Sequence, residues 1–149
     1  NHYIYSGQEQ KAIEYLDQAI AREPNVAQYH HIKGNLDENA KNYDAALADF
    51  DAALALDPTL ADAHAGKGRV YYNQAVKMNE DAAYITDQKA YNAALKEMNE
   101  MFRKALPHFE KAHELDPKNR DFIMILRGLY YNFQMDDKYT AISVDLHIV

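Results

Sequence analysis

Seven histidines and 23 acidic residues are the side chains of this chain that could bind a metal ion or transfer protons. Two ligands on one helix must share a face, which requires a spacing of about three or four residues. His30 and His31 are adjacent, and His108 and His113 are five residues apart, so neither pair meets this requirement. The HExxH, GxSxG, GxGxxG and GxxxxGK[ST] motifs do not occur either. The sequence therefore predicts a non-enzymatic protein with no catalytic residue, no metal site and no cofactor.

Three segments of the chain share one pattern, and the first two lie 34 residues apart. Each has an alanine, a large apolar residue four positions later, a second alanine and a closing proline. A fixed period of about 20 to 50 residues predicts an array of structural repeats in which each unit covers the apolar face of its neighbour. The three segments are Ala12–Pro24, Ala46–Pro58 and Ala105–Pro117.

This pattern resembles the tetratricopeptide repeat, a helix-turn-helix unit of about 34 residues. The resemblance implies an all-α fold, a right-handed α-solenoid of antiparallel helix pairs. It divides a single domain into a partial first repeat (1–26) and three further repeats (27–60, 61–119 and 120–149). The second repeat matches best, although Lys33 and Asp37 replace an expected leucine and tyrosine and should weaken its first helix. Its matching residues are His30, Gly34, Tyr43, Ala46, Phe50, Ala53 and Pro58.

The register of the repeats also assigns a role to two histidines and to the start of the chain. His30 and His64 stand where a core aromatic residue is usual, so we interpret both as packing residues. The second helix of the first repeat is predicted to start near Gln8, which leaves residues 1–5 as the last turn of its first helix. We therefore expect a fragment of a longer protein, with an open apolar face that forms a homodimer through the N-terminal end. The side chains of this face are Ile13, Leu16 and Ile20.

The third repeat contains an insertion, because Pro58 and Pro117 are 59 residues apart. Apolar residues recur through it at spacings of four and three, which predicts helix rather than loop. We expect a lengthened helical hairpin with its turn in residues 79–87 and with Thr86 or Asp87 as the cap of its second helix. Pro107 would either bend this helix or begin a new one. The apolar stripe consists of Tyr91, Leu95, Met98, Phe102, Ala105, Phe109 and Ala112.

Residues 140–149 fit two patterns. Alternating apolar residues have the period of a strand, whereas Tyr139, Ile142 and Leu146 have the spacing of a helix. A short closing helix is favoured, because a single strand would have no sheet to join.

The resemblance implies that the first helices of successive repeats line a concave groove, which holds a peptide or protein partner. Together with the projecting hairpin, this groove is the predicted binding site. The positions at which chaperone-binding relatives carry lysine and arginine are occupied by Asp62, Gly66, Asp121 and a residue near Ile125, so a chaperone tail is not the expected ligand. The predicted groove residues are Gln28, His31, Asn35, Asn39, Asp62, Arg69, Tyr72, Asn73, Asp121, Met124, Tyr131 and Asn132, with Ala65 beside them.

The charge and two further resemblances bear on partner and location. A net charge of −7 argues against nucleic acid as the partner, and no apolar run is long enough to span a membrane. Residues 105–139 are similar to the C-terminal part of cell-envelope tetratricopeptide proteins of the Bacteroidetes, which implies a periplasmic or envelope location without excluding the cytoplasm. The alternative function is that of a helical scaffold within a larger SusD-like, glycan-binding envelope lipoprotein.

Overall fold

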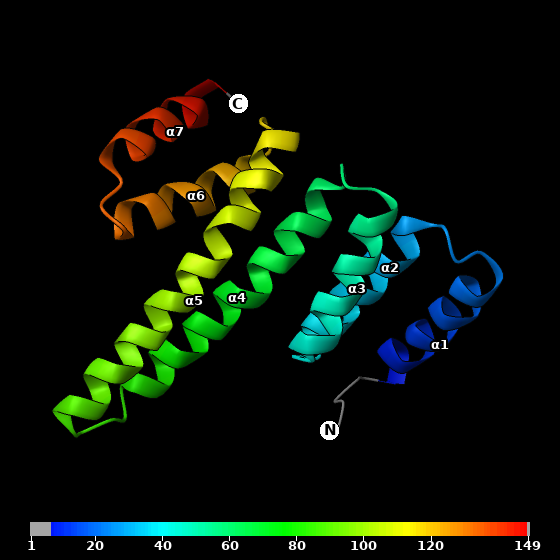
Figure 1. Ribbon diagram of the computed structural model, residues 1–149, viewed down its shortest axis with the longest axis horizontal. Coiled ribbons are helices and arrows are strands. Elements are labelled where there is room, and N and C mark those ends of the chain that lie inside the picture. Colours follow the sequence, from blue (N-terminus) through cyan, green and yellow to red (C-terminus); the bar gives the residue numbers. More distant parts are fainter. Residues whose placement is uncertain (1–6, 149) are drawn as a thin grey trace.

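The computed structural model describes residues 7–148, which form seven helices and no strand. Consecutive helices pack against each other, and Figure 1 shows them side by side from α1 to α7. The α4–α5 hairpin extends well beyond the other helices in this view. The helices are α1 (Gly7–Arg22), α2 (Ala27–Asn39), α3 (Tyr43–Leu56), α4 (Ala61–Ala82), α5 (Gln88–Leu115), α6 (Arg120–Asn132) and α7 (Asp136–Ile148).

The Phe50 ring sets the distance between α2 and α4. Phe50 lies on α3, is fully buried, and fills a space that two glycines leave open. A Cβ atom on Gly34 would lie 2.7 Å from Phe50 Cε1, and one on Gly66 would lie 2.5 Å from Phe50 Cζ. Both distances are shorter than van der Waals contact, so only glycine fits at either position. Gly34 is the close-packing glycine of the repeat pattern, whereas Gly66 belongs to the next unit.

Two kinds of polar contact join neighbouring repeats at equivalent positions. The His30 ring nitrogen Nε2 donates a hydrogen bond to the Pro24 carbonyl oxygen at 3.2 Å, and His64 repeats this bond to Pro58 at 3.0 Å. Each histidine therefore forms a hydrogen bond to the closing proline of the preceding repeat, in addition to the packing role predicted for it.

An ion pair accompanies each of these junctions. Lys33 on α2 binds Asp17 on α1 at 2.8 Å, and Lys67 on α4 binds Asp51 on α3 at 2.6 Å. Both pairs are partly exposed, so each is worth about 0.2 to 1 kcal/mol. Lys33 therefore replaces the expected leucine with a contact between repeats, and α2 runs unbroken over its full length.

The insertion forms the long helical hairpin that the apolar stripe predicts. The turn lies between Ala82 and Gln88, and the Asp87 carboxylate caps α5 by accepting a hydrogen bond from the Ala90 backbone at 2.8 Å. Pro107 lies inside α5, which continues through it as a single helix of 28 residues. Such a helix is about 42 Å long, about twice the length of α2 or α6. We call the part of this hairpin formed by residues 74–102 the arm.

The arm is held less tightly than the repeats. Four stripe residues (Tyr91, Leu95, Met98 and Phe102) are only half-buried, whereas Ala105, Phe109 and Ala112 nearer the repeats are buried. A pair of helices covers one face of each partner and leaves the flanks open, which explains the difference. At the other end of the chain, residues 136–148 are helical, so the helical reading of the tail is confirmed. None of the described helices is long and apolar enough to cross a bilayer.

The packing of Phe50 against Gly66 predicts that a glycine-to-alanine substitution has opposite effects on stability at Gly66 and at Gly128. Gly66→Ala should lower the free energy of unfolding by about 1 to 3 kcal/mol, because its methyl group overlaps the Phe50 ring. Gly128 lies inside α6 with nothing within 4 Å of its Cβ position. Gly128→Ala should raise stability by about 0.5 to 1 kcal/mol through helix propensity. Urea unfolding measures both, and equal effects at the two sites would contradict this packing.

Candidate functional site

The first helices of the second, third and fourth repeats present one set of equivalent positions. We call the second, fifth, ninth, twelfth and thirteenth residues of α2, α4 and α6 the inner face. All twelve predicted groove residues belong to it. Of these, the eight exposed residues are Gln28, Asn39, Asp62, Asn73, Asp121, Met124, Tyr131 and Asn132, and the four half-buried ones are His31, Asn35, Arg69 and Tyr72.

A charge-assisted hydrogen-bond network fixes the middle of the inner face. The Arg69 guanidinium on α4 donates to both carboxylate oxygens of Glu38 on α2, at 2.8 and 3.0 Å. It also donates to the Asn35 side-chain oxygen at 3.2 Å. Bidentate geometry makes this one of the stronger kinds of ion pair, and the Glu38 side chain is only 9% exposed. Arg69 is therefore neutralised by its own chain and is not a free site for an anion.

His31 extends this network as a neutral side chain. Its Nε2 atom lies 3.4 Å from the Asn35 amide nitrogen, which can donate to it, and its ring lies 6.0 Å from that of Phe50. Burial lowers the pKa of His31, and the positive charge of Arg69 lowers it further, although Asp62 and Glu38 oppose the change. A neutral ring accepts a hydrogen bond on one nitrogen, as this contact requires.

Three exposed asparagines occupy equivalent positions on the first helices of three repeats. Asn39, Asn73 and Asn132 are each the thirteenth residue of their helix. Within the described part of the chain, no hydrogen bond occupies their side-chain amides. An amide offers both donors and an acceptor, so it can bond the backbone of an extended peptide.

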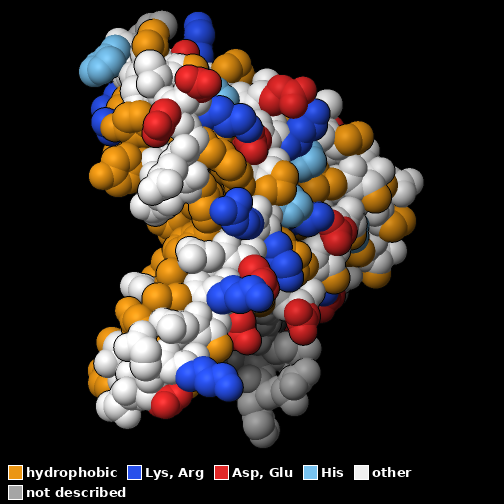
Figure 2. All heavy atoms as spheres, turned by 60° about the vertical axis from the view of Figure 1, so that its left-hand side comes forward, with side chains coloured by type: hydrophobic (Ala, Val, Ile, Leu, Met, Phe, Trp, Pro, Cys, Tyr) orange, Lys and Arg blue, Asp and Glu red, His pale blue; other side chains and the backbone are white. Residues whose placement is uncertain are grey.

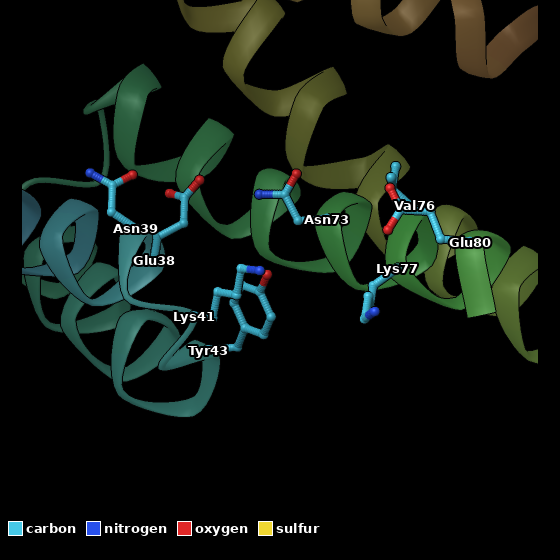
Figure 3. Close-up of a pocket in the computed structure, with 8 residues that line it drawn as sticks. All are labelled: Glu38, Asn39, Lys41, Tyr43, Asn73, Val76, Lys77 and Glu80. Atoms are coloured by element: carbon cyan, nitrogen blue, oxygen red, sulfur yellow. The ribbon is translucent and has the colours of Figure 1, made fainter. Parts of the chain in front are cut away.

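A pocket of about 380 Å³ opens where α4 passes the turn between α2 and α3. Figure 3 shows Asn73 between the α2 residues Glu38 and Asn39 on one side and Val76, Lys77 and Glu80 on the other. Lys41 and Tyr43 line the pocket from the turn and the start of α3. Val76, Lys77 and Glu80 lie on the part of α4 that the insertion adds. The insertion thus gives the inner face a wall that the other repeats lack.

Sequence reasoning missed six residues that line this pocket. Glu38 also binds Arg69, and the other five are Lys41, Tyr43, Val76, Lys77 and Glu80. The helical period could have identified some of them, because positions 73, 76, 77 and 80 lie on one face of a helix. Extending α4 past Asn73, as the insertion required, would have placed the last three beside Asn73.

The two tyrosines among the predicted groove residues, Tyr72 and Tyr131, differ in their environment. The Tyr131 side chain on α6 is 70% exposed, and Met124 on the same helix is 52% exposed. The Tyr72 ring packs edge-on against Phe102 and Phe109, at centroid distances of 5.2 and 6.4 Å. Tyr72 therefore contributes to the core between α4 and α5, and Tyr131 is the better available anchor. Ala65 is fully buried, so it offers a partner no surface.

The expected self-association face is less open than the sequence suggested. Ile13 is buried, whereas Leu16 and Ile20 are half-buried, and α1 packs against α2. An open apolar face is therefore wrong for Ile13, because the folded chain already covers it. The predicted helical turn at residues 1–5 lies outside the described residues, and the homodimer stays a prediction.

Two carboxyl groups meet inside the second repeat. Asp37 on α2 is only 2% exposed and hydrogen-bonds to Asp49 on α3. Burial raises the pKa of Asp49 to about 8, and the hydrogen bond and negative charge of Asp37 add to the effect, whereas Lys33 opposes it. The Asp49 carboxyl therefore favours its protonated form at neutral pH. The equivalent residues of the third repeat are Tyr71 and His108, whose rings stack at 5.7 Å.

No three His, Cys, Asp or Glu residues of the described chain are placed to hold a metal ion. Burial lowers the pKa of His108 to about 4, with Lys67 adding to the shift, so this ring is neutral. His113 lies on another face of α5, with Nε2 at 3.7 Å from Asp145.

Comparisons with known proteins identify the repeats and the fold. A family model described as "TPR repeat" matches residues 39–75, and one described as "Tetratricopeptide repeat" matches residues 3–26. The structure is similar to that of MamA, with 18% identity and a TM-score of 0.68 over 94% of this chain and 67% of MamA. It is also similar to a monomeric IFIT1 mutant with Gppp-AAAA, with 23% identity and a TM-score of 0.72 over 94% of this chain and 30% of IFIT1.

The predicted all-α tetratricopeptide solenoid is thereby confirmed. No curated protein sequence matches the chain. The resemblance to Bacteroidetes envelope proteins and the envelope location stay predictions.

The Asp37–Asp49 pair predicts a pH dependence of stability. The pKa of Asp49 is higher in the folded chain than the ordinary value of about 3.9, so folding favours the protonated form. This contribution to stability is complete below about pH 4 and is lost as the pH rises to about 8. Asp49→Asn mimics the protonated carboxyl, so it should raise the melting temperature at pH 8 and change it little at pH 4.

Thermal unfolding across this pH range provides the test. Asp44→Asn on the exposed side of α3 removes the same charge and is the control. A parallel shift of both variants at all pH values would show that the pKa of Asp49 is not raised in the folded chain.

Proposed function

We propose that this chain is a non-catalytic scaffold that binds an extended segment of another protein on its inner face, with the arm as a second contact. The tetratricopeptide fold generally serves as an interaction scaffold, which supports the class of function. The observation that carries the proposal is the set of exposed amides at Asn39, Asn73 and Asn132, to which the described part of the chain gives no hydrogen bond. Stability alone does not require three such amides at equivalent places on three helices.

The geometry of the inner face favours a bound peptide over a small ligand. The Arg69–Glu38 pair keeps α2 and α4 in a fixed relation, so the amides are held in place before binding. A prearranged surface loses less conformational entropy when it binds a flexible chain. The pocket beside Asn73 would accept one side chain of this segment, and Tyr131 would supply an aromatic contact on α6.

The arm contributes an exposed aromatic residue of its own. Tyr84 lies in the turn between α4 and α5 and is 87% exposed. A residue so far from the core adds little to folding, so a contact with a large partner would account for it better. The arm then adds affinity for a folded protein but not for a short peptide.

The binding proposal predicts that two exposed residues control peptide affinity. A peptide selected against the chain from a random library should bind at least about tenfold more weakly to Tyr131→Ala/Asn73→Ala, because an aromatic anchor is often worth about 2 kcal/mol. The melting temperature should change by no more than about 3 °C, since both side chains are exposed.

A matched double variant on the second helices distinguishes the loss of an inner-face contact from a general loss of peptide binding. Tyr15 on α1 and Asn99 on α5 are exposed like Tyr131 and Asn73. Tyr15→Ala/Asn99→Ala should leave the affinity of the selected peptide unchanged. If this control weakens binding as much as the first pair does, the inner face is not the binding site.

A further inference from the structure

The negative charge of the chain is concentrated in its first two repeats. Residues 7–60 contain ten acidic and four basic residues, whereas residues 61–149 contain thirteen acidic and twelve basic ones. Six of the seven net negative charges therefore lie on α1 to α3 and their connections. Figure 2 shows positive and negative side chains interspersed on the side where the arm and α7 come forward. A partner guided by charge would approach the first two repeats and the adjoining part of α4.

Where α2 meets α4, the described inner face and its pocket hold two acidic side chains without an ion pair and one such basic side chain. Its one arginine, Arg69, is already paired with Glu38, and Lys77 in the pocket is paired with Asp81 at 2.9 Å. Asp62 and Glu80 are exposed, and no ion pair engages either of them in the described part of the chain. Lys41 is the single unpaired cation among the residues that line the pocket.

Helix stability does not explain the acidic residues beside the pocket. The carbonyl end of a helix carries partial negative charge, so acidic residues in the last turn are unfavourable. Glu80 and Asp81 lie in the last turn of α4, which has no basic residue. Glu38 lies in the last turn of α2, whose carbonyl end also points toward the pocket region. Arg69 neutralises Glu38 and Lys77 neutralises Asp81, so a positively charged ligand would chiefly offset the charge of Glu80.

We infer that the inner face between α2 and α4 binds an extended protein segment that carries lysine or arginine side chains. The asparagine amides hold its backbone, and the carboxylates of Asp62 and Glu80 face its basic side chains. Tyr43 lines the same pocket and offers a ring on which a cationic group can lie. This inference rests on the proposed function and adds the chemical class of the partner.

Three labelled synthetic peptides of one length test the class of partner. They share one backbone composition and carry arginine, glutamine or glutamate at the same positions. Fluorescence anisotropy at low and physiological ionic strength gives their dissociation constants. The arginine peptide should bind at least about tenfold more tightly than the glutamate peptide, with a difference that shrinks as salt is added.

Three variants then locate the interaction. Asp62→Lys/Glu80→Lys should weaken binding of the arginine peptide about tenfold. Asp44→Lys/Glu97→Lys changes the net charge equally on the second helices α3 and α5, and Asp44 lies in a first turn as Asp62 does. This control should change the affinity by less than about threefold. Lys41→Asn should tighten binding, and asparagine tolerates the positive φ of 61° at this position.

The outcomes separate this inference from the function on which it rests. Equal or tighter binding of the glutamate peptide, or equal losses in the two charge-reversal variants, would overturn the basic partner while leaving the inner face as a peptide site. If none of the three peptides binds and a library selection also yields no ligand for the inner face, the proposed function and the inference both fail. If a single-stranded RNA oligonucleotide binds tightly and Asp62→Lys/Glu80→Lys improves its binding, the partner is nucleic acid and not a basic protein segment.

Discussion

The contact of the Phe50 ring with Gly34 and Gly66 is the constraint on which the rest of the structure depends. Because neither glycine has a Cβ atom, α2 and α4 approach the same ring from two sides. That approach brings Arg69 of α4 within hydrogen-bond distance of Glu38 and Asn35 on α2. It also places Asn39 and Asn73 on the rim of one pocket. The inner face is therefore a consequence of how closely the helices pack.

The sequence predicted those parts of the fold that depend on local or repeated patterns. The repeat period located α2 and α3, and the apolar stripe through Leu95 and Phe109 predicted the long hairpin, because helical spacing reflects burial within one element. The cap at Asp87 was predictable because its hydrogen bond spans only three residues.

Other features depended on contacts between elements and could not be predicted in this way. Lys33 and Asp37 looked like departures from the pattern, since the residues that accommodate them, Asp17 and Asp49, lie on other helices. Tyr72 was placed correctly on its helix, but its packing against Phe102 depends on where the inserted part of α5 lies. The pocket was missed for the same reason, because it forms only where the lengthened α4 passes another repeat.

The most direct test of the account is a map of the surface that a selected peptide contacts. Side-chain amide and backbone NMR signals of the isotope-labelled chain, followed during titration with the peptide, would provide it. The account predicts that the largest shifts occur at the Asn39 and Asn73 side-chain amides and along α2 and α4, with little change on α1 and on α3 beyond Tyr43. Shifts confined to α1, α3 or α7, with both asparagine signals unmoved, would contradict it.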